Sequence, residues 1–206
     1  MASACTCHLS HAPRLVVVTG GPGAGKTALL EVVQRDLCWH AVVLPEAASI
    51  LWRGQFPRHP TIAGRKAAQR AIVRVQIEMQ RMTIEEGRAG LIVCDRGTLD
   101  GLAYWPGSER EYFEDIASTK QRELERYATV IHMRTPSLDH GYMPSPFRIE
   151  SAAEAALIDE QIDAAWAGHP RRFMIDSDDD FVAKLHRALD LIRAEVPACC
   201  RARPSS

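Results

Sequence analysis

Residues Gly20 to Thr27 read GGPGAGKT, which matches the pattern G-x-x-x-x-G-K-[ST]. The segment follows the apolar run RLVVVT and precedes ALLEVVQ, in which apolar residues recur at helical spacing. Glycines let such a loop turn its backbone N–H groups toward one anion, and the helix that begins there adds its dipole. The sequence therefore predicts a loop between a strand and a helix that holds the phosphates of ATP or another nucleoside triphosphate.

The residues of this loop differ in their expected roles. Lys26 would reach the β- and γ-phosphates, and the Thr27 hydroxyl would ligate Mg²⁺. We expect the nucleotide to be bound by Gly21, Pro22, Gly23, Ala24, Gly25, Lys26, Thr27 and Ala28.

Short apolar runs alternate along the chain with helical patterns, which predicts an α/β fold of three layers, a five-stranded parallel sheet with helices on both faces. The predicted strands are Arg14 to Val18, Ala41 to Leu44, Ala89 to Cys94, Thr129 to Met133 and Arg172 to Ile175. The predicted helices are residues 26–36, 46–52, 62–86, 108–126, 151–166 and 178–195. A chain of 206 residues can bury one sizeable core, so we expect one domain over residues 13–196, with disordered tails at 1–12 and 197–206.

Polar residues follow two of the predicted strands, at the edge of the sheet where ligands of open parallel sheets bind. Asp95 is expected to bind Mg²⁺ together with Thr27, and its alternative role is a helix N-cap. Arg96 would hold a substrate hydroxyl or phosphate, or else form a structural ion pair. Glu46 would take the proton of an attacking hydroxyl, a role for which Asp95 competes, or would simply begin the next helix.

The overall charge and hydropathy exclude several classes of partner. The formal net charge is -1, which gives no field for nucleic acid. No apolar run approaches the roughly 20 residues that span a bilayer, and no signal pattern begins the chain, so we expect a cytoplasmic protein without a membrane partner. The sequence leaves a homodimer open.

The six cysteines follow no regular framework, which favours free thiols. Cys5, Cys7, His8 and His11 would be able to ligate a metal, but the sequence shows no second group of ligands to complete a site. We therefore interpret this segment as a disordered tail.

Five segments, taken in their order along the chain, support a family resemblance: GGPGAGKT, PEAAS, DRGTLDGLAY, FRIESAAEA and HPRRFMIDSDDDF. In these segments the sequence resembles the nicotinamide-riboside-kinase-like, AAA-type ATPases of the P-loop nucleoside and nucleotide kinase superfamily, over about residues 14–192. The resemblance implies the strand order 2-3-1-4-5, a mobile lid, and transfer of a γ-phosphoryl group from ATP, with Mg²⁺, to a small acceptor. The catalytic residues that it implies are Lys26, Glu46, Asp95, Arg96 and, in the lid, Arg148, with Arg134 a weaker lid candidate. It also places residues 176–180 beside the nucleotide base.

Two functions are compatible with these patterns. The first is a phosphotransferase that acts on a nucleoside-like or other hydroxyl-bearing metabolite, bound between Glu46, residues 53–60 and the long helix. Gln69 and Gln76 of that helix would read an amide of the acceptor, or would be ordinary surface side chains. The second is a switch or scaffold that binds a nucleotide and has no acceptor, in which residues 134–147 respond to the γ-phosphate. The absence of an N-K-x-D motif after the fourth strand argues against a standard GTPase.

Overall fold

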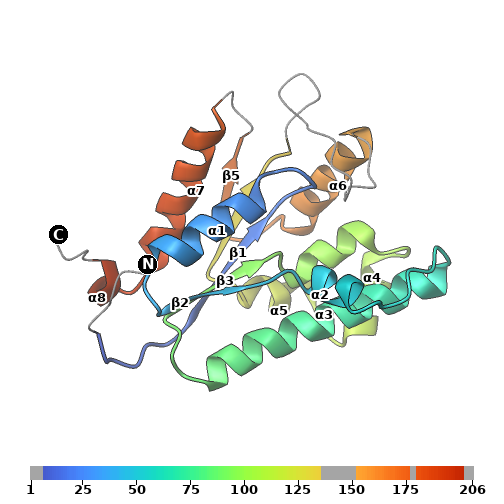
Figure 1. The fold of residues 1–206 in the computed structure, drawn as a ribbon. Helices are drawn as coiled ribbons and strands as arrows, with labels where there is room; N and C mark the ends of the chain where they lie inside the picture. The colour runs from blue at the N-terminus through green and yellow to red at the C-terminus, as the bar shows by residue number, and fades with distance from the viewer. Residues whose placement is uncertain (1–6, 136–151, 177–179, 202–206) are drawn as a thin grey trace.

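The computed structural model describes residues 7–135, 152–176 and 180–201. Its strands are β1 (Arg14–Thr19), β2 (Ala41–Leu44), β3 (Leu91–Asp95), β4 (Thr129–Met133) and β5 (Arg172–Ile175). They form one parallel sheet in the order β2-β3-β1-β4-β5, with β1 at the centre (Figure 1). The predicted fold class and strand order are confirmed.

Helices cover both faces of the sheet. They are α1 (Lys26–Asp36), α2 (Ala47–Arg53), α3 (Ile62–Glu85), α4 (Glu109–Ile116), α5 (Lys120–Glu125), α6 (Ala152–Ala165), α7 (Phe181–Glu195) and α8 (Ala198–Arg201), and η1 (Thr98–Tyr104) is a 3-10 helix. In Figure 1, α1 and α7 lie together on one side of the sheet, while α3, α4 and α5 lie on the other.

The alternation of side chains along β1 explains these two layers. Val16 and Val18 pack in one buried cluster with Leu29 of α1 and Ile192 of α7. Leu15 and Val17, one residue out of phase, point to the opposite face and join a second cluster. That second cluster also includes Val73 of α3, Tyr112 and Phe113 of α4, and Trp166, which directly follows α6. Because both faces are covered, the strands carry nearly continuous apolar residues.

The segment that we predicted as one helix over residues 108–126 consists of two helices. Ser108 begins α4 with a reciprocal cap to Glu111, and α4 ends at Ala117, whose φ of 54° is left-handed. Thr119 then caps α5 by accepting a hydrogen bond from the N–H of Arg122. The prediction of a single helix is wrong because Ala117, a residue that favours helices, occupies the turn.

The first and last described segments, residues 7–13 and α8, lie near the amino edge of the sheet, where His11 and Cys200 approach His40. Residues 198–201 form α8, although we had expected a disordered tail from residue 197. The N-terminal residues that the structure describes, 7–13, form no helix or strand. Over the described ranges, no helix has the length and apolar character needed to cross a bilayer.

Candidate active site

The predicted phosphate loop connects β1 to α1 at the carboxyl edge of the sheet. Three of its glycines, Gly20, Gly23 and Gly25, have positive φ angles of 126°, 81° and 93°. A Cβ at Gly20 would lie 2.0 Å from the carbonyl oxygen of Met133, and one at Gly25 would lie 2.7 Å from the ring of Phe181. The loop therefore requires glycine both for its backbone conformation and for lack of space.

Lys26, the first residue of α1, is buried and bends back over the loop. Its Nζ donates hydrogen bonds to the carbonyl oxygens of Gly20, at 2.7 Å, and Gly21, at 2.8 Å. Burial, and secondarily the positive charge of Arg96, lower the pKa of Lys26 below its ordinary value. An anion in the loop would favour the charged form of this amine, which makes Lys26 a suitable partner for phosphate.

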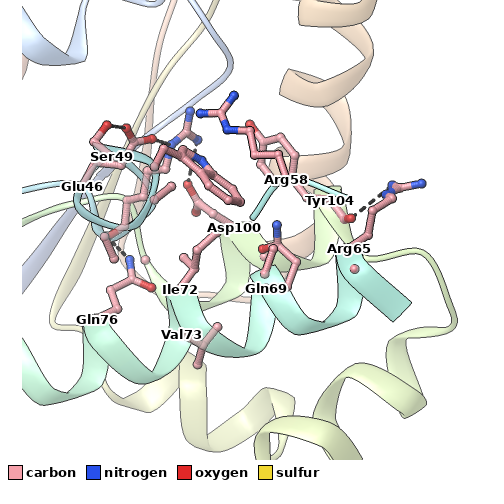
Figure 2. Close-up of a pocket in the computed structure, with 18 of the residues that line it drawn as sticks. Glu46, Ser49, Arg58, Arg65, Gln69, Ile72, Val73, Gln76, Asp100 and Tyr104 are labelled. Atoms are coloured by element: carbon pink, nitrogen blue, oxygen red, sulfur yellow. Dashed lines mark hydrogen bonds and ion pairs between the residues drawn. The ribbon is translucent and has the colours of Figure 1, made fainter. Parts of the chain in front are cut away.

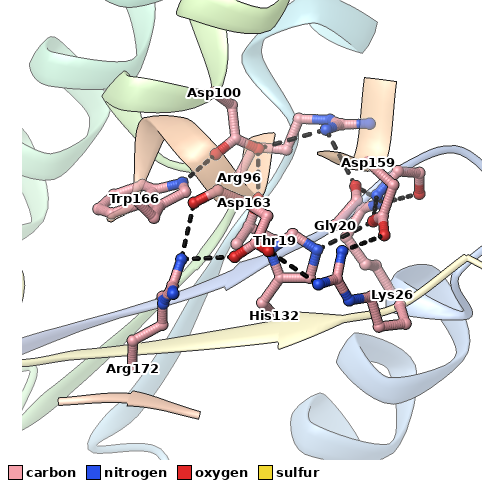
Figure 3. Close-up of polar contacts among 12 residues, drawn as sticks. Thr19, Gly20, Lys26, Arg96, Asp100, His132, Asp159, Asp163, Trp166 and Arg172 are labelled. Atoms are coloured by element: carbon pink, nitrogen blue, oxygen red, sulfur yellow. Dashed lines mark hydrogen bonds and ion pairs between the residues drawn. The ribbon is translucent and has the colours of Figure 1, made fainter. Parts of the chain in front are cut away.

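Asp159 of α6 fixes the beginning of the loop, a role that the sequence did not indicate (Figure 3). Its Oδ1 accepts hydrogen bonds from the N–H of Gly21, at 2.7 Å, and from His132 Nε2, at 2.9 Å. Arg134 donates to Oδ2 at 3.1 Å. Burial alone would raise the pKa of Asp159, but the hydrogen bonds from His132 and Gly21 outweigh it and hold the pKa at about 2. The loop is thus anchored to α6 by a carboxylate that is ionised at neutral pH.

Arg96, directly after β3, connects the predicted acid Glu46 to Asp100 and to the phosphate loop. Its Nε donates to Glu46 Oε1 at 2.6 Å, and its Nη1 donates to Asp100 Oδ2 at 3.2 Å and to the carbonyl oxygen of Gly20 at 3.3 Å. The φ of Arg96 is 70°, a left-handed conformation that is uncommon outside glycine. The structure therefore shows the ion pair that we considered for Arg96, and its contact with substrate stays a prediction.

Glu46 occupies the N-cap position of α2, but its side chain makes no capping hydrogen bond. Its carboxylate instead accepts from Arg96 and, at 2.5 Å, from the Ser49 hydroxyl. Burial would raise the pKa of Glu46, but the charge of Arg96 and these hydrogen bonds lower it below the ordinary value. Glu46 is therefore held as a carboxylate by the side chains of Arg96 and Ser49.

Asp100 is a further buried acid that the sequence analysis did not single out, although it lies in the quoted segment DRGTLDGLAY. It accepts hydrogen bonds from Thr19 Oγ1, at 2.7 Å, and Trp166 Nε1, also at 2.7 Å, besides its ion pair with Arg96 (Figure 3). Asp100 thus joins the end of β1, the segment after β3 and the end of α6.

Asp95 is the last residue of β3, and Gly97 rather than Asp95 is the cap of the following helix. Burial raises the pKa of Asp95 above its ordinary value, although the ammonium group of Lys26 opposes this shift. Thr27, at the beginning of α1, is exposed. Mg²⁺ prefers oxygen ligands such as a carboxylate and a hydroxyl, and it usually binds substrate phosphates as well. Asp95, Thr27 and the phosphate loop can supply this combination, so these residues fit the predicted metal.

A cavity of about 610 Å³ opens beside the phosphate loop (Figure 2). Its walls come from Pro22 of the loop, from α2, from residues 58–60, from α3 and from η1. Gln69 and Gln76 of α3 both line it and are 9% and 4% exposed, so the interpretation of these two as surface side chains is wrong. Gln76 donates to the carbonyl oxygen of Arg96 at 2.9 Å. The amide of Gln69 makes no hydrogen bond to any residue that the structure describes.

Some predicted site residues lie outside the described ranges. They are Arg148, most of the predicted lid segment from residue 136 onward, and residues 177–179 of the segment expected beside the nucleotide base. Arg134, the weaker lid candidate, is described. It forms ion pairs with Asp159 and Asp163, at 3.1 and 2.8 Å.

Comparisons with known proteins agree with this architecture. The sequence profile of the AAA domain family matches residues 15–184. Similar solved structures include thymidylate kinase from Candida albicans, with 12% identity over 90% of this chain and 93% of that one, at a TM-score of 0.57. Another is the NadR protein in complex with NAD and AMP-PNP, with 16% identity and a TM-score of 0.62.

The second comparison covers 95% of this chain but only 52% of NadR, so the chain spans about half the length of that protein. At these identities the likeness concerns the fold. A search of curated proteins gave no match to the sequence. The profile match covers most of the chain and confirms the AAA-type assignment, so the protein belongs to the AAA domain family and has a P-loop, kinase-like fold.

Proposed function

We propose that this protein is an ATP-dependent, Mg²⁺-dependent phosphotransferase whose acceptor is a small nucleoside-like or other hydroxyl-bearing metabolite. The observation that carries the proposal is the position of the 610 Å³ cavity. It shares Pro22 with the phosphate loop, and Glu46, Arg96 and Asp100 lie in its wall. An acceptor there would lie next to the terminal phosphate of a bound nucleotide, as transfer requires.

In this proposal the chain's own residues position the reactants and balance their charge. The loop amides and the Lys26 ammonium bind the phosphates, and the guanidinium of Arg96 lies between the loop and the cavity, near the negative charge that develops during transfer. Mg²⁺ held by Thr27 and Asp95 would neutralise charge on the β- and γ-phosphates.

Glu46 is the better candidate for the general base. It lines the cavity, whereas Asp95 does not. Its low pKa keeps the carboxylate ionised and able to accept the proton of an acceptor hydroxyl within hydrogen-bond reach. Asp95 is then left to the metal.

The lining of the cavity favours an acceptor with a flat ring and a polar edge. Trp52 presents its ring there, with the guanidinium of Arg58 stacked 4.4 Å from the ring centroid. Ile72 and Val73 add apolar surface, and the buried amide of Gln69 would pair with a polar group of the acceptor (Figure 2).

Incubation with labelled ATP, Mg²⁺ and a panel of nucleosides, sugars and vitamins tests the proposal. We expect Glu46→Gln to lower kcat for the acceptor by about 100-fold or more, with little change in ATP affinity. Glu85→Gln, in an exposed pair with Arg81, is the matched control and should leave kcat unchanged. Lys26→Ala should weaken ATP binding in a calorimeter.

Recognition of the acceptor is tested separately. Gln69→Leu should raise the acceptor KM and leave ATP affinity unchanged, whereas Gln121→Leu, at an exposed position of α5, should alter neither. ATP turnover that no acceptor accelerates, with Glu46→Gln as active as the unmodified protein, would contradict a kinase and favour the nucleotide-dependent switch or scaffold.

A further inference from the structure

A group of sulfur and nitrogen ligands lies at the edge of the sheet opposite the phosphate loop. Cys38 and His40 belong to the connection between α1 and β2, directly before the amino end of β2, and Cys200 belongs to α8. One potential ligand atom from each of the three lies within 4.8 Å of the others. Cys38, which is buried, is a free thiol.

The distances in this group suit a tetrahedral metal. His40 Nδ1 lies 3.9 Å from Cys38 Sγ and 3.2 Å from Cys200 Sγ. Zinc lies about 2.3 Å from thiolate sulfur and about 2.0 Å from imidazole nitrogen, so tetrahedral angles place sulfur and nitrogen roughly 3.5 Å apart. The two observed distances lie on either side of this value, and small side-chain movements would bring both to it.

The backbone of His40 is held in place by hydrogen bonds, but one nitrogen of its buried ring has no hydrogen-bond partner among the described residues. Its backbone carbonyl accepts from the N–H groups of Gly90, at 2.8 Å, and Leu91, at 3.0 Å, and its side chain is buried with 1% exposure. Its Nε2 is buried without a hydrogen-bond partner among the described residues.

A second pair of ligands approaches the same imidazole from the N-terminal segment. Cys7 Sγ lies 3.5 Å from His11 Nε2, and the His11 ring stands edge-on to the His40 ring with centroids 5.0 Å apart. A potential ligand atom from each of Cys7, His11 and His40 lies within 4.8 Å of the others. The second ligand group that the sequence analysis did not find is therefore supplied by the fold.

We propose that Cys38, His40 and Cys200 bind one Zn²⁺ ion, with the fourth ligand available from the Cys7 and His11 pair. The sulfur and nitrogen donors select zinc over Mg²⁺ or Ca²⁺, which prefer oxygen. Since the site lies at the amino edge of the sheet, away from the phosphate loop, its role is structural. It ties the N-terminal segment and α8 to the beginning of β2.

The test is zinc binding by the full chain, reduced and stripped of metal, measured by competition with a chromophoric chelator. Cobalt(II) substitution provides a second readout, because thiolate ligands give a charge-transfer band in the near ultraviolet. We expect about one zinc per chain. Cys38→Ser and Cys200→Ser should each raise the zinc Kd by more than about 100-fold, beyond the 10–100-fold effect of losing an outer-shell partner.

Matched controls separate loss of the site from loss of folding. Cys94→Ser removes another buried thiol, on β3, and His186→Gln removes an exposed imidazole on α7, and both should bind zinc as tightly as the unmodified chain. Zinc should raise the melting temperature of the unmodified chain and of both controls, and have no such effect on Cys38→Ser or Cys200→Ser.

Two results would overturn the assignment. One is zinc affinity in Cys38→Ser and Cys200→Ser equal to that of the unmodified chain, with cobalt spectra that lack thiolate bands. The other is zinc affinity that disappears in a Cys7→Ser, His11→Gln double variant but persists in Cys38→Ser and in Cys200→Ser. That result would place the ion on the N-terminal group instead.

Discussion

Replacement of Asp100 by asparagine tests the network that holds the site together. The carboxylate of Asp100 accepts hydrogen bonds from three donors, Thr19, Arg96 and Trp166. An amide of the same shape has one acceptor oxygen, so its NH₂ group must face at least one of these donors. An orphaned buried donor costs about 1–3 kcal/mol, and removal of one partner from a buried ion pair costs about 3–5 kcal/mol.

Glu46 remains as a second partner for Arg96, so we expect the lower end of the ion-pair range, about 3 kcal/mol of unfolding free energy. For a chain of this size, that corresponds to a melting temperature about 6–12 °C lower. The control is Asp115→Asn, since Asp115 pairs with Arg70 at 3.3 Å and both side chains are partly exposed. Its cost should be below about 1 kcal/mol. Urea unfolding of both variants gives the comparison, and equal losses would refute the assignment of a buried, cooperative network to Asp100.

Three further changes test other parts of the structure. Asp159→Asn should lower the unfolding free energy by roughly 2 kcal/mol at pH 7, because its hydrogen bonds hold the pKa of Asp159 at about 2, below the ordinary value. The stability that this low pKa provides is present above pH 4 and is lost as the pH falls from about 4 to 2, so urea midpoints of the two proteins should converge over that range. Gly21→Ala would place a Cβ 2.4 Å from the hydroxyl of Thr135 and should weaken ATP binding by at least about tenfold in a calorimeter, whereas Gly87→Ala, with open space around it, should not. Ala117→Gly relieves a left-handed φ of 54° at an exposed position and should raise the unfolding free energy by up to about 1 kcal/mol, and a lower melting temperature would contradict this.

The sheet could be predicted from short apolar runs in the sequence, because burial of a strand is what requires such a run. A strand buried on both faces needs continuous apolar residues, and β1, β2, β4 and β5 lie where such runs occur. Chain order alone predicted that Glu46, Asp95 and Arg96 lie at one edge of the sheet, since parallel strands bring their carboxyl ends to one edge. Neither inference needs knowledge of side-chain packing.

Other features depend on contacts between distant parts of the chain. Asp159 meets Gly21 across 138 positions, and Cys200 meets His40 across 160. No local spacing marks such pairs. The sequence left the role of Gln69 open for a related reason. A polar residue on a long helix is typical of a solvated face, and only the tertiary structure shows that a cavity lies beside this one.

The left-handed backbone of Arg96 follows from the position that its side chain must reach. One guanidinium contacts the phosphate loop at Gly20, the wall of the 610 Å³ cavity at Glu46, and the buried carboxylate of Asp100. Such a conformation costs of order 1–3 kcal/mol outside glycine and persists only when the surroundings enforce it. Here three directed contacts enforce it, together with the hydrogen bond from Gln76 to the backbone carbonyl of Arg96. A lysine would supply the charge but not the planar fork that meets several acceptors at once. The strain at Arg96 is therefore explained by its position between the phosphate loop and the 610 Å³ cavity, where one side chain contacts both.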